Sequence, residues 1–277
     1  MICGTTSLIA HIGYPTFTFK SPQIYNPYFE HAGIDVVVVP MGCQAPDYPA
    51  FLRAVFTLTN ITGALITMPH KVSTVALLHE ASTAVQIAGA CNAVRRTADG
   101  HLQGDLFDGE GFVRGVQRKG LVLQDARVMI AGTGGVGSAI AASLAAAGIA
   151  QLRLFDMHSS VADHLASRLR THYPQLQVET GCNDPSDMDL VVNATPLGMN
   201  AGDPLPIDVK KLSPNCMVGE VVLRTEMTAL LLAAQERGCR VQVGSDMLFE
   251  QIPAYLEFFG LPSTTPEQLR ALAQIKS

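Results

Sequence analysis

Six residues near the middle of the chain form a glycine-rich stretch that can bind phosphate. The stretch GTGGVG, residues 132–137, follows the apolar run RVMIA and precedes the alanine-rich SAIAASLAAAGIA. Gly132 permits a tight turn, Gly134 a close approach of ligand to backbone, and Gly137 close packing of a helix on a strand. Free N–H groups at the start of the following helix suit a pyrophosphate. The stretch predicts a dinucleotide site, and a tight strand-to-helix turn that binds nothing is the alternative.

An acidic residue follows this stretch at the separation that dinucleotide sites use. Asp156 ends the run QLRLFD and comes 19 positions after Gly137. A carboxylate about 20 residues after the glycines accepts hydrogen bonds from the ribose hydroxyls of NAD and repels the 2′-phosphate of NADP. Arg153 and His158 are close enough in sequence to soften that repulsion. We expect NAD or NADP as the cofactor, with NAD favoured by Asp156.

Strand-like and helix-like segments alternate along the whole chain. Short β-branched runs at 34–40 and 63–69 are separated by segments with helical spacing, and residues 70–81 predict a third helix. Residues 91–107 predict a hairpin that turns at ADG, and strand–helix alternation resumes at residue 127. Helices are expected at 226–237, 246–259 and 265–275. The alternation predicts an α/β fold with mainly parallel sheets, and a chain of 277 residues is long enough for two domains.

Composition excludes several classes of function. The net charge of −5 and the pI near 5.9 argue against nucleic acid as a partner. The start of the chain has no signal-peptide pattern, and no apolar segment reaches the roughly 20 residues that span a bilayer. The six cysteines are scattered, which predicts free thiols in a reducing cytoplasm, and neither cysteines nor histidines have metal-site spacing. We expect a cytoplasmic protein without a metal site, membrane or nucleic-acid partner.

Seven stretches of the chain occur in an order and spacing that resemble the shikimate/quinate dehydrogenase family. They are GYPTFTFKSPQIYN, GALITMPHK, GACNAV, DGHLQGDLFDGEGF, GTGGVGSA, DLVVNATPLGM and GSDMLFEQ. The resemblance implies an N-terminal α/β substrate-binding domain (1–105 and 245–277) and a Rossmann-like NAD(P)-binding domain (106–244), with the active site in the cleft between them. It also implies reversible oxidation of the ring hydroxyl of shikimate, a small hydroxy acid, to 3-dehydroshikimate. A homodimer is possible.

Two residues are catalytic candidates by this resemblance. Lys71, in GALITMPHK, and Asp108, in LFDGEG, match the Lys–Asp couple that contacts the reacting hydroxyl. A lysine can accept the hydroxyl proton in its neutral form and donate to the developing ketone oxygen as an ammonium. The alternative is an exposed lysine in a first helical turn and an aspartate that caps a helix, both of which are common.

The resemblance also implies binding residues for both ligands. The substrate-binding positions are Phe19, Ser21, Thr67, Asn92 and Gln251. The cofactor-binding positions are Gly132, Gly134, Gly135, Val136, Gly137, Asp156, Asn193, Ala194, Thr195, Val221, Gly244 and Met247. Ser21 precedes Pro22, so a helix cap is an equally good explanation of this serine. Ordinary loop or core packing is the alternative for the positions that follow Asp156.

Several positions depart from the family pattern. Phe19 stands where the family has serine, and Leu65 where it has asparagine. The resemblance implies that the polar groups at these two positions hold the carboxylate and ring hydroxyls of the substrate. Leu223 stands where the family has tyrosine. Leu106 and Phe107 replace two polar residues of the motif before Asp108. A lost hydrogen bond to a charged group costs about 1.5–3 kcal/mol, or roughly ten- to a hundredfold in affinity. We therefore expect weaker shikimate binding or a modified substrate, and Phe19→Ser should lower the KM for shikimate.

Three functions are compatible with these residues. The first is a shikimate or quinate dehydrogenase with an altered pocket. The second is an oxidoreductase that acts on another polyhydroxy or amino-substituted cyclohexene acid. The third is a dinucleotide-binding sensor that has lost catalysis. The presence of both Lys71 and Asp108 favours the first two.

Overall fold

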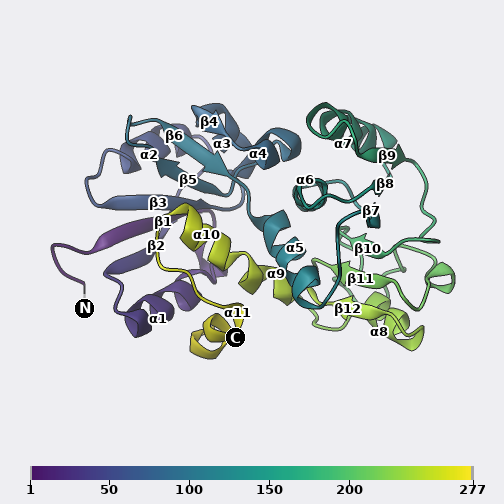
Figure 1. Cartoon of the computed structure of the whole chain (residues 1–277). Helices are drawn as coiled ribbons and strands as arrows, with labels where there is room; N and C mark the ends of the chain where they lie inside the picture. Colours follow the sequence, from purple (N-terminus) through teal and green to yellow (C-terminus); the bar gives the residue numbers. More distant parts are fainter. Residues whose placement is uncertain (1, 276–277) are drawn as a thin grey trace. The chain divides into compact units, whose positions relative to one another are not determined.

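The computed structural model describes residues 2–275 and divides them into two compact units (Figure 1). Unit 1 contains the residues up to Val85, then Gly89–Phe107, and the residues from Ile252 onward. Unit 2 contains Gln86–Ala88 and Asp108–Gln251. Unit 1 is therefore built from both ends of the chain. Helix α9 (Gly244–Glu250), expected with the substrate-binding part, belongs to unit 2, where it packs against α5 (Asp108–Arg118).

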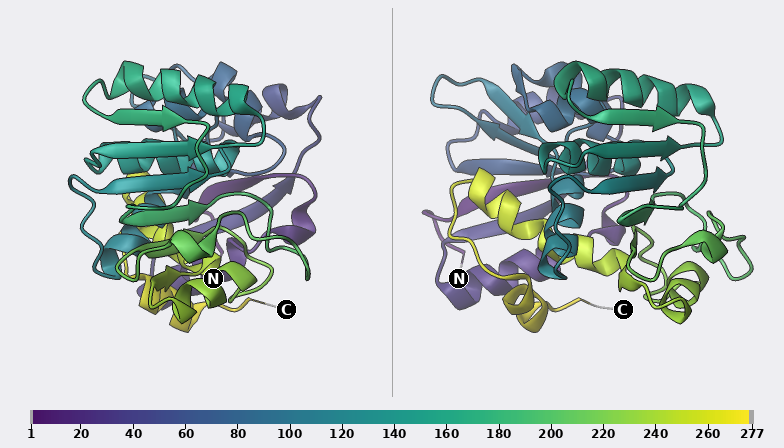
Figure 2. Two further views of the ribbon diagram at one scale, coloured as in Figure 1. Left: turned by 90° about the vertical axis from the view of Figure 1, so that its right-hand side faces the viewer. Right: turned by 45° about the vertical axis from the view of Figure 1, so that its right-hand side comes forward.

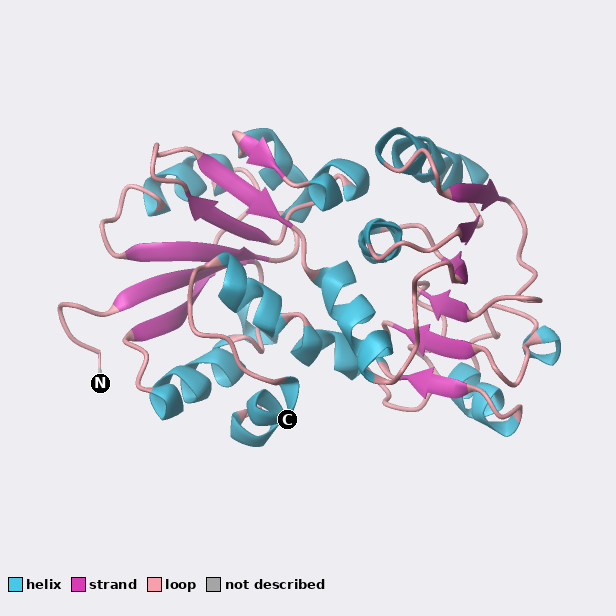
Figure 3. Cartoon of the chain, in the orientation of Figure 1, coloured by secondary structure: helices cyan, strands magenta, loops and turns pink. Residues whose placement is uncertain are grey.

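The sheet of unit 1 is mixed. Its six strands, in spatial order, are β2 (Val36–Gly42), β1 (Ser7–Gly13), β3 (Ile61–Ile66), β5 (Ala93–Arg96), β6 (Leu102–Asp105) and β4 (Glu80–Ala81). β1 is parallel to β2 and β3, whereas β5 is antiparallel to β3 and β6 (Figure 3). The predicted hairpin is β5–β6, and it makes this sheet less parallel than the alternation indicated.

Short helices accompany the sheet of unit 1. They are η1 (Thr16–Thr18), α1 (Pro22–Ala32), α2 (Tyr48–Val55), α3 (Lys71–Thr74), η2 (Val75–Leu77), α10 (Ile252–Phe258) and α11 (Pro266–Leu272), and α4 (Thr83–Ala88) begins in this unit. α1 packs against β2 and α11. The core contains Ile9, Ile24, Phe29, Tyr48 and Leu52, all buried. The C-terminal residues thus complete the packing around the N-terminal strands.

The sheet of unit 2 is entirely parallel. Its strands, in spatial order, are β12 (Arg240–Gln242), β11 (Met217–Glu220), β10 (Leu190–Asn193), β7 (Arg127–Ala131), β8 (Gln151–Phe155) and β9 (Gln177–Thr180). The remaining elements of the unit are α6 (Gly135–Ala146), α7 (Ser159–His172), η3 (Val209–Lys211) and α8 (Ala229–Glu236). Figure 2 shows the strands side by side, with α7 running along β8 and β9. The strand order reverses between β7 and β10, which is where open α/β sheets bind ligands.

The structure differs from the expected elements in three places. β1 was not expected as a strand, because His11 and Gly13 interrupt its apolar pattern. The helix expected at 70–81 ends early, since the backbone N–H of His79 donates to the carbonyl of Leu102 and residues 80–81 pair with β6. The helix expected at 246–259 is divided at Gln251, because Pro253 has no N–H to continue it. Among residues 2–275, no helix is long and apolar enough to cross a membrane.

Candidate active site

The glycine-rich loop of unit 2 leaves space at the start of α6. Gly132 has φ +91°, and a Cβ there would lie 2.7 Å from the carbonyl carbon of Ala194. A Cβ on Gly137 would collide with the carbonyl oxygen of Gly132. At Gly134 and Gly135, by contrast, a Cβ would meet nothing within 4 Å. The loop is tight on its protein side and open at the helix N-terminus, which fits a bound pyrophosphate.

Asp156 lies beside this loop and is held as an anion. Its Oδ2 accepts hydrogen bonds from the N–H of Thr133 (2.8 Å) and from Thr133 Oγ1 (2.9 Å). Its Oδ1 accepts from the N–H of His158 at 3.0 Å. Burial alone would raise the pKa of Asp156, but these hydrogen bonds outweigh it and the pKa is lowered. A negative charge therefore stands at the end of β8, joined to the loop.

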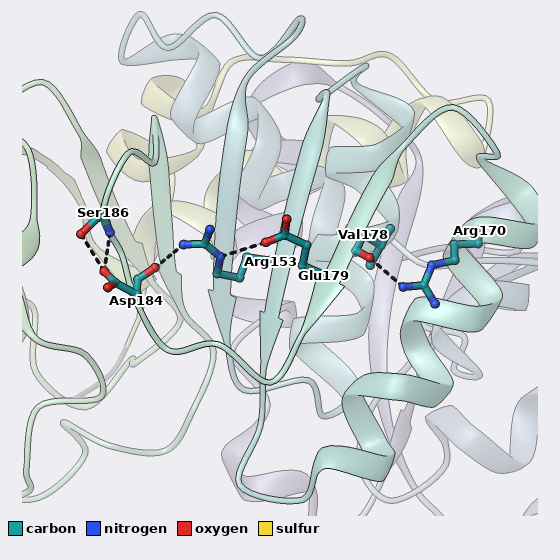
Figure 4. A network of polar contacts seen from close by, with 6 residues as sticks. All are labelled: Arg153, Arg170, Val178, Glu179, Asp184 and Ser186. Atoms are coloured by element: carbon teal, nitrogen blue, oxygen red, sulfur yellow. Dashed lines mark hydrogen bonds and ion pairs between the residues drawn. The ribbon is translucent and has the colours of Figure 1, made fainter.

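Arg153 does not compensate this charge, contrary to the expectation. Its Nε donates to Oε2 of Glu179 at 3.3 Å, and its Nη1 donates to the carbonyl of Asp184 at 2.5 Å (Figure 4). The Asp184 carboxylate in turn accepts from Ser186 and Lys211. Arg153 is used to join β8, β9 and the following loop, so it is not directed to a phosphate beside Asp156.

The segment after β10 lies against the glycine-rich loop. The N–H of Ala194 donates to the carbonyl of Ala131 at 2.7 Å, and Ala194 and Thr195 are the residues that a Cβ on Gly132 would strike. Asn193 Oδ1 accepts from the N–H and the hydroxyl of Thr195, and its Nδ2 donates to the carbonyl of Leu197. Asn193 thus orders the turn that brings these residues to the loop.

The other predicted cofactor positions of unit 2 also lie together. A Cβ on Gly244 would collide with the carbonyl oxygen of Val222 and would lie 2.8 Å from the carbonyl carbon of Val221. Met247 is buried on the same helix, α9, as Gly244. Leu223, which stands in place of the expected tyrosine, is 53% exposed and is therefore not part of the hydrophobic core. Gln251 ends α9, and its Oε1 is buried without a hydrogen-bond partner among the described residues.

Glu220 is a buried acid of this region that the sequence patterns did not single out. It ends β11 beside Asn193 of β10, and it is fully buried. Thr228 Oγ1 donates to its Oε2 at 2.9 Å, while its Oε1 has no partner within residues 2–275. Burial raises the pKa of Glu220 to about 7, although the hydrogen bond from Thr228 acts against this rise. Its sequence signal was an acid inside the apolar run MVGEVV.

Lys71 of unit 1 stands at the carboxyl end of β3. It is the first residue of α3, and Thr67 lies at the end of the strand, with its N–H bonded to the carbonyl of Ile12. The N–H of Cys91 donates to the carbonyl of Lys71 at 2.9 Å, which holds the start of α3 beside Asn92. Three of the predicted residues, Thr67, Lys71 and Asn92, are therefore brought together.

Asn92 offers a hydrogen-bond donor that the protein does not use. It is 1% exposed, and its Oδ1 accepts from the N–H of Phe107 at 2.9 Å. Its Nδ2 is buried and has no partner among the described residues. Buried donors are nearly always paired in folded proteins, so this orphan donor, on the residue after the one that bonds the carbonyl of Lys71, marks a candidate ligand site.

Phe19 lies at the same end of the sheet. It is buried, and its ring stacks on that of His11, with centroids 4.0 Å apart. Two residues later Ser21 precedes α1, and its side chain makes no capping hydrogen bond, so the structure does not support the helix-cap alternative. His11 is a second residue that the sequence patterns missed, and its signal was a histidine inside the apolar run SLIAHIG.

Asp108 begins α5 in unit 2 and is 8% exposed. It lies inside the helix at its first position, where a carboxylate interacts favourably with the helix dipole. The two residues before it, Leu106 and Phe107, are buried in unit 1, where Phe107 packs edge-on against Tyr255 and Phe258. These apolar replacements therefore serve the core.

Comparison with known proteins identifies the family of this chain. The model of the shikimate dehydrogenase substrate binding domain matches residues 12–94, and the ThiF family model matches residues 113–160. A shikimate dehydrogenase (NADP(+)) of Rubrobacter xylanophilus is 34% identical, over 98% of this chain and 97% of its own length. The chain belongs to the shikimate dehydrogenase family.

Other relatives and solved structures agree with this family. A shikimate dehydrogenase (NADP(+)) of Alkaliphilus metalliredigens is 30% identical over 90% of both chains. Quinate dehydrogenase from Corynebacterium glutamicum, solved in complex with NAD, is 29% identical, with a TM-score of 0.84 over 96% of this chain and 98% of that one. Shikimate 5-dehydrogenase from Listeria monocytogenes, in complex with shikimate and NAD, has a TM-score of 0.91 over 98% and 97% at 24% identity, and it shows the shared fold.

Within residues 2–275 no group of three or more His, Cys, Asp or Glu side chains is arranged to hold a metal ion. The six cysteines, all within this range, are free.

Proposed function

We propose that the protein catalyses the reversible oxidation of shikimate by NAD(P)+, which yields 3-dehydroshikimate, NAD(P)H and a proton. The observation that carries this proposal is the orphan Nδ2 donor of Asn92, which follows Cys91, the residue bonded to the start of α3 where Lys71 stands, in a chain of the shikimate dehydrogenase family. Unit 1 is the substrate-binding part and unit 2 the cofactor-binding part of this proposal. Phe19, Ser21, Thr67, Asn92 and Gln251 are the proposed substrate-binding residues.

Lys71 is the proposed proton acceptor. A neutral Lys71 takes the hydroxyl proton when shikimate is oxidised, and the ammonium returns a proton to the carbonyl oxygen in the reverse direction. Asp108 is the acid proposed to act with Lys71 on that hydroxyl. A nicotinamide cofactor, which the glycine-rich loop and Asp156 would hold, would supply the hydride acceptor for oxidation and the hydride donor for reduction. The amide of Asn92 and the hydroxyl of Thr67 orient the hydroxyl groups of the ring.

We propose NAD as the preferred cofactor. The shikimate dehydrogenases of Rubrobacter and Alkaliphilus carry NADP(+) in their names, whereas the quinate dehydrogenase was solved with NAD. In this chain Asp156 is an anion beside the loop, and Arg153 is directed to Glu179 and Asp184. A 2′-phosphate next to Asp156 would be repelled without a neighbouring arginine to offset the charge.

Steady-state hydride transfer tests this function directly. Purified protein is assayed with shikimate and with quinate, each with NAD and with NADP, by absorbance of the reduced nicotinamide. Turnover of shikimate that is lost in Lys71→Ala is the expected result. Higher efficiency with quinate would instead favour a quinate dehydrogenase, as in the relative solved with NAD. Absence of turnover in all four combinations, with cofactor still bound in titrations, would favour the sensor.

A further inference from the structure

Three buried residues form one face at the end of the unit 1 sheet, and we name it the His11–Phe19–Leu65 wall. His11 and Leu65 are register partners on the parallel strands β1 and β3, so their side chains share a face. The ring of Phe19 stacks on His11 at an interplanar angle of 27°. The exposed fractions of the three residues are 6%, 8% and 4%.

This wall adjoins the proposed substrate-binding residues of the same unit. A Cβ on Gly13 would lie 2.9 Å from Cζ of Phe19 and would also collide with Cγ2 of Thr67. The tip of the Phe19 ring therefore reaches the point where β1 ends beside Thr67. The positive charge of Lys71 acts on His11 from the same region. A substrate held by Thr67 and Lys71 would have the wall as a neighbour.

The wall carries no charge of its own at neutral pH. Burial, together with the charge of Lys71, lowers the pKa of His11 to about 4, so its imidazole is neutral. A neutral imidazole has one N–H donor and one nitrogen acceptor. Nδ1 of His11 is buried without a partner among the described residues. Phe19 and Leu65 add no polar group.

A carboxylate and a hydroxyl differ in what they would find here. A carboxylate only accepts hydrogen bonds, and it needs several donors or a positive partner to leave water. The wall gives it at most one neutral N–H. A hydroxyl both donates and accepts, so it can pair with His11 in either tautomer, while its carbon packs on Phe19 and Leu65.

We propose that this wall selects a substrate with an uncharged, hydroxyl-bearing substituent where shikimate has its carboxylate, and that His11 binds this hydroxyl. The inference rests on the proposed function, because it concerns the substrate of the same hydride transfer. It makes His11 a specificity-determining residue and assigns Lys71 to the reacting hydroxyl alone.

A matched pair of compounds tests the proposal. Shikimate is compared with its hydroxymethyl analogue, in which the carboxylate is reduced to a primary alcohol and the ring hydroxyls are unchanged. The expected kcat/KM is at least roughly tenfold higher for the analogue, the lower end of what one lost hydrogen bond to a charged group costs. Equal or higher kcat/KM for shikimate would overturn this inference and leave the proposed function standing. Failure of both compounds, with cofactor bound, would overturn the proposed function and the inference with it.

Variants of the wall residues test whether the wall causes the preference for the hydroxymethyl analogue over shikimate. Phe19→Ser adds a donor and opens space, so the ratio of the two kcat/KM values should move toward shikimate by roughly tenfold or more. Phe17→Ser is the matched control, because Phe17 is 87% exposed and the same change there should leave the ratio unaltered. If Phe19→Ser does not fold, Leu65→Asn adds a polar group to the same wall and should move the ratio in the same direction. An unchanged ratio in a folded wall variant would contradict the assignment.

Discussion

The carboxyl ends of the two sheets differ in how they treat polar groups. In unit 2 the polar side chains next to the glycine-rich loop are hydrogen-bonded within the protein: Asp156 by Thr133 and His158, and Asn193 by Thr195. Oε1 of Glu220 is the exception at this end of the sheet, since it has no partner among the described residues. In unit 1 the donor of Asn92 and Nδ1 of His11 have no partner among the described residues, and they stand among aromatic and aliphatic side chains. The glycine-rich loop is thus held in place by hydrogen bonds before a ligand binds, whereas the unsatisfied groups of unit 1 define what a ligand there must supply.

Each unit also buries a titratable residue near this end of its sheet, and burial favours the neutral form of both residues. Burial raises the pKa of the acid Glu220 to about 7 in unit 2. Burial and the charge of Lys71 lower the pKa of the base His11 to about 4 in unit 1. Burial disfavours the charged form in both cases, so the shifts have opposite signs for an acid and a base. The two units should therefore respond to pH in opposite directions.

The largest expected effect comes from Lys71. Lys71→Ala removes the proposed proton acceptor, and general acid–base groups contribute about 10²–10⁴-fold to rate. We expect kcat/KM to fall by that factor while cofactor affinity, measured by titration, is unchanged. Lys210→Ala, at an exposed lysine of η3, is the control. A smaller loss than tenfold in Lys71→Ala would remove Lys71 from the mechanism.

Glu220 and His11 together test the opposite pH responses. Below pH 4.5 Glu220 is neutral in both the folded and the unfolded chain, and its full contribution to stability is present. This contribution is lost as the pH rises from 4.5 through about 7, because the unfolded chain ionises Glu220 first. Glu220→Gln should therefore gain stability over the wild type across this window, by at most about 3 kcal/mol. The free energy of unfolding, from denaturant melts at each pH, measures this gain.

The His11 contribution should change in the other direction. The folded protein loses stability as the pH falls from about 6.5 to about 4. In this window the unfolded chain protonates His11, whereas the folded protein keeps its imidazole neutral. His11→Gln should gain on the wild type toward low pH, again by at most about 3 kcal/mol. Gains of both variants in the same direction would contradict the comparison between the two units.

A variant of Asp156 tests the cofactor preference of unit 2. Asp156→Asn removes the negative charge and keeps a hydrogen-bonding side chain, so the preference for NAD over NADP should fall by roughly ten- to a hundredfold. The ratio of kcat/KM for the two cofactors measures this preference. An NADP preference in the wild type would overturn the assignment of Asp156 as the discriminating residue.

The smallest expected effect concerns the open side of the glycine-rich loop. In Gly134→Ala the methyl group meets no protein atom within 4 Å, so the melting temperature should be unchanged while cofactor affinity falls about tenfold, or about 1.4 kcal/mol. Gly137→Ala is the matched contrast, because its methyl group would strike the backbone at Gly132 and lower stability. Unchanged cofactor affinity in Gly134→Ala would show that the pyrophosphate lies elsewhere.

Motif reasoning predicted unit 2 better than unit 1. The glycines, Asp156 and the alternation of strands and helices around them follow local rules of backbone space and periodicity, which can be read from adjacent residues. Whether β1 forms a strand, and where the helix after residue 70 ends, depends on pairing with strands distant in sequence. One such pairing is the hydrogen bond from His79 to Leu102. His11 and Glu220 were missed for the same reason, since only the folded packing reveals that they are buried. The orientation of Arg153 toward Glu179 was likewise decided by a neighbouring strand.

The discontinuity of unit 1 has a consequence for biosynthesis. The ring of Phe258 lies over Arg95, whose Nη1 donates to the carbonyl of Phe258 at 2.6 Å, and Phe107 packs against Tyr255. These partners emerge from the ribosome only after all of unit 2 has been made. Because domains fold as units during synthesis, the later half of the chain can reach its native state while the first half still waits for its last helices. A chain that stops at residue 251 would carry a folded unit 2 attached to an incomplete, aggregation-prone unit 1.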